Sequence, residues 1–147
     1  MSRWSSKPPF DVLGFVNDHC FKYVTDFGRL GPDEGKGGKF LILPPNYDGE
    51  VPEGYHVAQS NTYGNWVIWR GFQVDGSTKP AVDATKKTFR IYPLSQKGSP
   101  PEMNFVNVSG KSFNTIHRMD YHIFEEINDV VQAEPNDGES PEILGYM

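Results

Sequence analysis

Apolar residues in the first part of the chain recur every three or four positions. Between residues 9 and 27 this spacing is typical of one face of a helix, and Gly28 follows where a left-handed cap would end it. The apolar positions are Val12, Phe15, Val16, Cys20, Tyr23, Val24 and Phe27. Gly14 costs such a helix about 1 kcal/mol relative to alanine, so packing against a sheet must supply most of its stability. The pattern therefore predicts an N-terminal amphipathic helix in which Cys20 is a packed core thiol.

Shorter apolar runs in the middle of the chain predict β-strands. Residues 40–43 form a run that two prolines stop, which is typical of a buried strand. Residues 55–60 and 65–70 flank a four-residue turn and predict an antiparallel hairpin rich in aromatic residues. Apolar side chains occupy both faces of residues 65–70, so we expect this strand to be buried on two sides. Two further strands are predicted over residues 90–94 and 104–109.

Two more helices are predicted by their start and stop signals. Residues 77–88 have Pro80 near the first turn, and residues 121–133 follow the potential cap Asp120 and precede Pro135. Together the elements predict one α+β, mainly β, domain segment over residues 1–147. We expect an antiparallel sheet, in the form of a partial barrel or sandwich, with the N-terminal amphipathic helix packed on it and a helix near the C-terminus.

A last helix signal comes at the end of the sequence. Ser140, Pro141 and Glu142 start a helical turn that the following residues do not complete. A helical nucleus this short does not hold itself together. The pattern predicts that this polypeptide is a fragment, or that it pairs with another chain.

Composition narrows the classes of partner. The net charge is -5 and the pI is about 5.3, which describes a soluble, acidic protein and argues against a nucleic-acid partner. The single cysteine forms no internal disulfide and no thiolate cluster. No run approaches the roughly 18 apolar residues of a membrane span, and none near the start has the form of a signal peptide. The sequence predicts no cofactor.

Several ordered motifs resemble one family of proteins. They are Gly31-Pro32-Asp33, the run from Gly35 to Pro45, Val51-Pro52-Glu53-Gly54-Tyr55, Ser60-Asn61-Thr62, the run from Trp66 to Arg70, Val74-Asp75-Gly76, Tyr92-Pro93-Leu94-Ser95, Phe113-Asn114-Thr115-Ile116-His117 and Glu134-Pro135. Together with residues 12–28 they are similar to the pattern of the domain of unknown function DUF1254. The resemblance spans residues 10–144.

The resemblance implies an organisation rather than a chemistry. Members of the family are typically longer proteins in which this module precedes a DUF1214 domain of jelly-roll type, and many are exported or associated with the cell envelope. The resemblance predicts no DUF1214 domain within residues 1–147. The implied partners are therefore that downstream domain or identical chains. No catalytic residue is carried over from the family.

Four side chains are candidates for catalysis. His117, Asp120 and His122 lie within six residues, where imidazole and carboxylate groups can share a cation or a proton. Two histidines five positions apart do not share a helix face, however, and Asp120 has an ordinary role as a helix cap. We therefore predict no metal site. Arg70 follows a strand predicted to be buried and needs a carboxylate, such as Asp26 or Asp75, or a ligand anion.

Aromatic rings concentrate in the predicted hairpin. Tyr63, Trp66 and Trp69 are candidates for binding a sugar or another planar ligand. Packing of the same rings in the core is the favoured alternative, because apolar residues occupy both faces of the strand.

The sequence supports three hypotheses for function and leaves open whether the chain is an enzyme. The first is a structural or assembly module of a larger exported or envelope-type protein. The second is a fragment of a hydrolytic or carbohydrate-active enzyme, with the four candidates named above. The third is a small-ligand-binding module at the aromatic hairpin.

Overall fold

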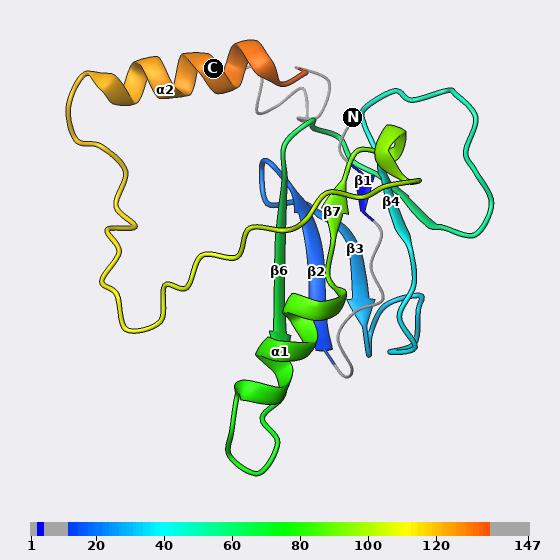
Figure 1. Ribbon diagram of the computed structural model, residues 1–147. Coiled ribbons are helices and arrows are strands. Elements are labelled where there is room, and N and C mark those ends of the chain that lie inside the picture. The colour runs from blue at the N-terminus through cyan, green and yellow to red at the C-terminus, as the bar shows by residue number, and fades with distance from the viewer. Residues whose placement is uncertain (1–2, 5–11, 136–147) are drawn as a thin grey trace. The chain divides into compact units, whose positions relative to one another are not determined.

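The computed structural model describes residues 3–4 and 12–135 and divides the chain into two compact units, residues 1–103 and 104–147. In the first unit the elements are β1 (Arg3–Trp4), β2 (Val12–Asp18), β3 (Tyr23–Gly28), β4 (Phe40–Leu43), β5 (His56–Gln59), β6 (Asn65–Gly71), α1 (Lys79–Thr88), β7 (Ile91–Tyr92) and the 3-10 turn η1 (Leu94–Gln96) (Figure 1). The second unit contains α2 (His122–Ala133). The described chain is thus mixed, with more strand than helix in its first unit.

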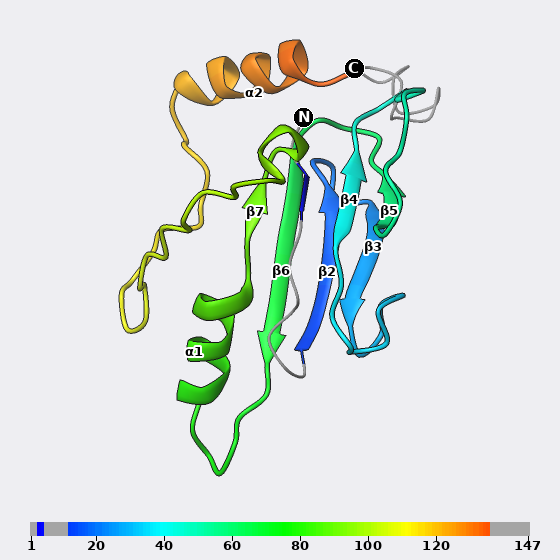
Figure 2. The ribbon, with the colours of Figure 1, turned by 45° about the vertical axis from the view of Figure 1, so that its right-hand side comes forward.

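The central sheet has three antiparallel strands in the order β3-β2-β6 (Figure 2). Strand β2 pairs with β6 along its whole length, from Val12 opposite Gly71 to Asp18 opposite Asn65. Its other edge pairs with β3, with a bulge between Val16 and Asn17. Two smaller pairs accompany the sheet: β4 with β5 in parallel, and β1 with β7 antiparallel. The predicted antiparallel sheet is therefore present.

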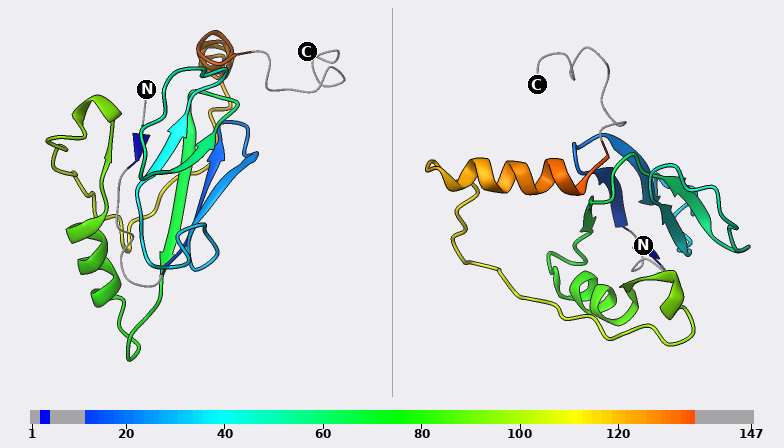
Figure 3. Two further views of the ribbon diagram at one scale, coloured as in Figure 1. Left: turned by 90° about the vertical axis from the view of Figure 1, so that its right-hand side faces the viewer. Right: turned by 90° about the horizontal axis from the view of Figure 1, so that it is seen from above.

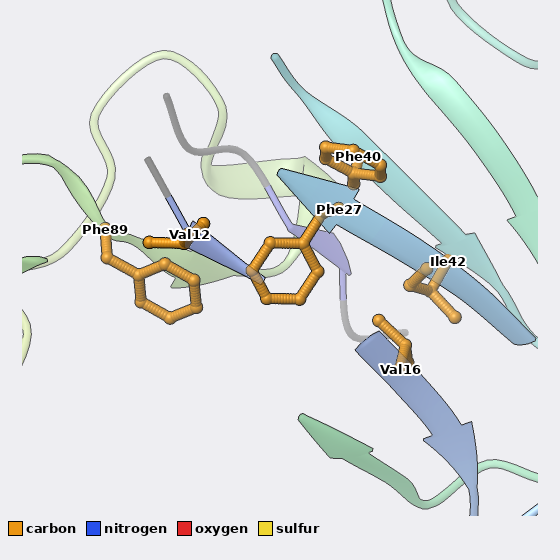
Figure 4. Close-up of a cluster of buried hydrophobic side chains, with 6 residues drawn as sticks. All are labelled: Val12, Val16, Phe27, Phe40, Ile42 and Phe89. Atoms are coloured by element: carbon orange, nitrogen blue, oxygen red, sulfur yellow. The ribbon is translucent and has the colours of Figure 1, made fainter. Parts of the chain in front are cut away.

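One face of the central sheet forms the core. Six buried side chains from β2, β3, β4 and the residue after α1 make its centre: Val12, Val16, Phe27, Phe40, Ile42 and Phe89 (Figure 4). Trp69 of β6 joins them by stacking on Phe89, with ring centroids 4.3 Å apart. Helix α1 and strand β7 lie on this core side of the sheet (Figure 3). The opposite face of the sheet is left outside the core.

Gly14 is required by this packing. A Cβ atom built on Gly14 would lie 2.2 Å from the ring of Phe27, which is closer than any real contact. Gly14, which is unfavourable in the predicted helix, is therefore the position of β2 where the absence of a side chain makes room for the ring of Phe27.

The predicted helix over residues 9–27 is wrong over residues 12–27, where the chain forms β2, a turn and β3. Burial along β2 alternates at every residue, which is the period of a strand and not of a helix. The β-branched and aromatic residues of this segment favour strands, and pairing on both edges of β2 satisfies its backbone groups. Cys20 lies in the turn and is exposed, so it is not a core thiol.

Two other predictions need correction. The hairpin of residues 55–70 is wrong in its pairing, because β5 lies parallel to β4 and β6 pairs with β2. The strand over residues 104–109 is wrong as well: this segment has no regular structure, and Val106 is 72% exposed. The physical reason is the same in both cases, because the partner strand decides where a strand lies and whether it forms.

The predicted strand over residues 40–43 and the two later helices are confirmed. Strand β4 has the predicted bounds, and α1 and α2 lie within one or two residues of theirs. Strand β7 is shorter than predicted and ends before Pro93. The predicted helix start at residues 140–144 lies outside the described residues. No helix in the described part of the chain is both long and apolar enough to cross a membrane.

Candidate functional site

The side of the central sheet that faces away from the core carries the most unusual side chains of the first unit. We call it the open face. Its members are Leu13, Phe15 and Asn17 of β2, Trp66, Ile68 and Arg70 of β6, and Tyr23, Asp26 and Gly28 of β3. Strand alternation puts them together, because their neighbours Val16, Phe27, Val67 and Trp69 point into the core. Trp66 is 47% exposed and Ile68 is 45% exposed.

The expectation that β6 is buried on both sides is therefore wrong. Val67 and Trp69 pack against the core, whereas Trp66, Ile68 and Arg70 are exposed on the other side of the same strand. A sequence pattern reports which residues are apolar but not how many layers cover a sheet. In the structure, the core covers only one side of β6.

The turn between β2 and β3 adds an aromatic ring at one end of the open face. Phe21 is 60% exposed, has a φ of 63°, and stacks on Trp66 with ring centroids 5.2 Å apart. A left-handed backbone at a bulky residue costs about 1–2 kcal/mol. Asp18 holds the turn in this form, because its buried carboxylate accepts a 2.8 Å hydrogen bond from the backbone N–H of Lys22.

Buried Thr62 fixes this turn against the loop before β6. Its Oγ1 accepts a hydrogen bond from the backbone N–H of His19 and donates one to the carbonyl of Gly64, both 2.8 Å long. The two aromatic side chains on either side of the junction, Phe21 and Trp66, are thereby held next to each other. The hydrogen bonds of buried Thr62 therefore hold the exposed stack of Phe21 and Trp66 in place.

Charged groups flank the apolar centre of the open face. The Tyr23 hydroxyl donates to Asp26 Oδ2 over 3.3 Å. Partial desolvation, followed by the negative charge of Asp26, raises the pKa of the Tyr23 hydroxyl above its ordinary value. Arg70 makes no ion pair with any residue among those described, so neither Asp26 nor Asp75 serves it within the chain. Within the described residues, the face therefore presents one cation without an ion pair and one carboxylate, on opposite edge strands.

A sequence model of DUF1254, a family described as proteins of unknown function, matches residues 7–93. The chain belongs to the DUF1254 family. The match covers more than half of the 147 residues, and its described part holds every element from β2 to β7. No curated protein matches the sequence. The open face thus lies within the DUF1254 region, whereas α2 lies after it.

The structure separates the ligand candidates that the sequence had grouped. Tyr63 is 58% exposed in the loop before β6, Trp66 is on the open face, and Trp69 is on the core face of the same strand. These three rings do not line one site. Sequence reasoning missed the open-face residues Phe15, Tyr23 and Ile68 and the neighbouring ring of Phe21. The short run of apolar and β-branched residues over positions 12–16, which lacks polar residues, was the signal that could have found this DUF1254 strand.

The catalytic candidates after the DUF1254 region are exposed. Asp120 Oδ1 accepts a 3.0 Å hydrogen bond from the backbone N–H of His122 and lies 3.1 Å from its Nδ1. Asp120 thus forms a local contact with His122 at the start of α2, whose N-cap position is Tyr121 and has no side-chain cap hydrogen bond. His117 is exposed and has no recorded contact with either residue. Among the described residues, no three His, Cys, Asp or Glu side chains gather closely enough to hold a metal ion.

An open pocket of about 650 Å³ runs along α2 within the second unit. Its lining residues are Tyr121, Phe124, Glu125, Asn128 and Asp129. None of the four catalytic candidates lines it. The apolar face of α2 is exposed next to it, with Phe124 63% and Ile127 50% accessible to solvent.

Proposed function

We propose that this DUF1254 protein is an assembly module that associates with another polypeptide through the open face of its central sheet. One observation carries the proposal: Trp66 and Ile68 are about half exposed on one face of the edge strand β6, whose other face packs against the core. Each Å² of apolar surface left in water costs about 25 cal/mol, and contiguous exposed patches mark interaction surfaces.

The strained turn at Phe21 supports the same function. A phenylalanine at positive φ gains nothing for the core when its ring points to solvent. Backbone strain persists where the surrounding structure enforces it, and it concentrates at functional positions. Here the hydrogen bonds of Asp18 and Thr62 enforce it, and the result is a larger apolar surface beside Trp66.

The exposed helix α2 offers independent support. Its residues Phe124, Ile127, Val130 and Val131 share one face and are all exposed. An amphipathic helix gains most of its stability by covering that face. Both units of the chain therefore expose apolar surface of the kind that assembly buries.

The two alternatives have less support. The enzyme hypothesis needs a dry cleft that brings acid, base and substrate together, but His117, Asp120 and His122 are open to solvent. The ligand hypothesis needs free ring faces, yet Phe21 covers one face of Trp66 and Phe89 covers one face of Trp69. Assembly is consistent with both the exposure of the histidines and the stacking of the tryptophan rings.

The proposed module has the form of an incomplete sandwich or partial barrel. Phe40 and Ile42 of β4 face Val16 and Phe27 of the central sheet across one core, so the β4-β5 pair is a second layer. A layer placed on the open face would bury the sheet on both sides. The sequence of β6, apolar on both faces, is the sequence of such a strand.

Ile68→Asp tests the proposed function, with Val57→Asp as its matched control. Ile68 is 45% exposed on the open face, and Val57 is 46% exposed on β5. The wild-type protein is expected either to associate in sedimentation velocity or, as a monomer, to bind an apolar dye such as anilinonaphthalene sulfonate. Ile68→Asp should weaken whichever signal is seen, and Val57→Asp should leave it unchanged. A wild-type monomer that binds no dye, or equal effects of the two variants, would overturn the proposal.

A further inference from the structure

We infer that the polypeptide covering the open face is a second copy of this chain, related by a twofold axis that runs along β2. The inference rests on the proposed function and names its partner. It is carried by the placement of large, small and charged side chains on the three strands of the open face.

The strand register arranges the open face in three rows. Arg70 of β6, Leu13 of β2 and Gly28 of β3 form the first row. Ile68, Phe15 and Asp26 form the second row. Trp66, Asn17 and Tyr23 form the third. The β6 edge thus carries long or bulky side chains in every row, whereas the β3 edge has no side chain at buried Gly28, a short one at Asp26 and the exposed ring of Tyr23.

A twofold axis along β2 places these unequal edges against each other. Rotation about this axis lays β2 over β2 of the second copy and lays each β6 over the other copy's β3. Leu13 and Phe15 then meet their own equivalents on the axis. Arg70 and Ile68 of each copy then lie over Gly28 and Asp26 of its partner, and Trp66 lies over the partner's Tyr23. Each contact off the axis forms twice, as a closed, isologous dimer requires. Aligned packing of this kind, at about -30°, is a common way for two sheets to stack.

The charges are complementary under the same operation. Arg70 of one copy lies over Gly28 of the other, one row from Asp26, which a long arginine side chain reaches. Arg70 has no ion pair among the described residues, and the Asp26 carboxylate has the Tyr23 hydroxyl as its recorded partner there. The rotation forms this pair twice. A twofold axis across the strands lays β6 over β6 instead, and it leaves Arg70 on the opposite edge from the partner's Asp26.

The area of the face is adequate for a specific contact. Phe21 and Tyr23 expose 60% and 67% of their surface, and Trp66 and Ile68 expose 47% and 45%. With about 150–250 Å² per aromatic side chain, these four residues alone offer on the order of 500 Å², and a standard interface buries about 800 Å² per partner. The other members of the open face supply the remainder.

Charge reversal of the two edge residues tests the inference. Arg70→Asp makes both charges of the face negative, and Asp26→Arg makes both positive. The wild-type full chain should sediment as a dimer, and each variant alone should dissociate on the order of tenfold more readily or beyond. An equimolar mixture of the two variants should form a heterodimer, because both of its pairs then join opposite charges. Lys97→Asp, a charge reversal away from the face, should leave the dimer intact.

A double variant and a folding control distinguish a lost charge pair from a lost fold. The double variant with Arg70→Asp and Asp26→Arg in one chain restores both pairs and should dimerise, and circular dichroism shows whether each variant is folded. Folded variants that stay monomeric in the mixture, or that dimerise singly as the wild type does, would overturn the inference. A wild-type monomer that binds the apolar dye at Ile68 would also end it, while leaving the assembly function in place for a different partner.

Discussion

The two faces of the β3-β2-β6 sheet carry similar residues and have opposite environments. The inner face has Val67 and Trp69 of β6 against Phe27 and Phe89, and every ring there meets another ring or an aliphatic side chain. The outer face has Trp66 and Ile68 of the same strand, with Phe15 beside them, and solvent reaches the rings. Hydrophobicity therefore favours burial of a residue at some interface, whereas the fold decides whether this chain supplies both sides of that interface.

The largest expected difference between the faces is the cost of deleting a ring. Phe89 is fully buried, so Phe89→Ala should lower the free energy of unfolding by about 3–5 kcal/mol through lost packing and a cavity. Phe21→Ala removes the same ring from a position that is 60% exposed and should cost less than about 1 kcal/mol. Urea unfolding at low protein concentration measures both. Comparable losses would show that the outer face is as well packed as the inner one.

The next effect comes from adding an atom to the inner face. Gly14→Ala places a methyl group where the Phe27 ring already lies and should cost about 1–3 kcal/mol of stability. Gly98→Ala is the control, because nothing lies within 4 Å of the position that its added methyl group would occupy, and the φ of Gly98 is ordinary. Thermal unfolding of the two variants makes the comparison. An unchanged midpoint for Gly14→Ala would mean that Phe27 does not cross β2 at this point.

A smaller effect is expected where the turn at Phe21 is tied to the loop before β6. Thr62→Val leaves the His19 N–H and the Gly64 carbonyl without their Thr62 partner and should cost about 1–2 kcal/mol. Thr88→Val removes a hydroxyl that bonds within one turn of α1, and should cost less. The same unfolding measurement applies. Association should weaken in Thr62→Val and not in Thr88→Val, because only the former holds Phe21 beside Trp66.

The smallest effect concerns the electrostatics of the outer face. Tyr23 should ionise above its ordinary pKa of about 10, and Asp26→Asn should lower this pKa because it removes the negative charge beside the hydroxyl. A raised pKa in the folded state means that any stabilisation is present below the unfolded pKa and is lost as the pH rises through the folded value. The effect is thus confined to pH above about 10. Tyrosinate absorbance, with Tyr23→Phe as the reference, measures it, and the same titration in both forms of residue 26 would contradict the assignment.

Sequence reasoning recovered elements whose signals are local. The strand at Phe40–Leu43 is stopped by prolines, and the helices Lys79–Thr88 and His122–Ala133 carry their own start signals, so each is defined within about a dozen residues. The open face escaped prediction because its nine residues come from three strands that only their pairing brings together.

By itself, the sequence determined that the chain is acidic, that it mixes strands with two helices after residue 77, and that it resembles DUF1254. The tertiary structure decided what residues 12–28 become. The positions of Val12, Val16 and Phe27 are compatible with one face of a helix and also with strands. Strands form because β2 pairs with β3 on one edge and with β6 on the other. The tertiary structure also decided which side of β6 is interior. A side of a strand is buried only where another part of the chain packs on it, and that packing involves residues far away in the sequence. Local patterns record the preference of each residue, and only long-range contacts choose among the structures that satisfy it.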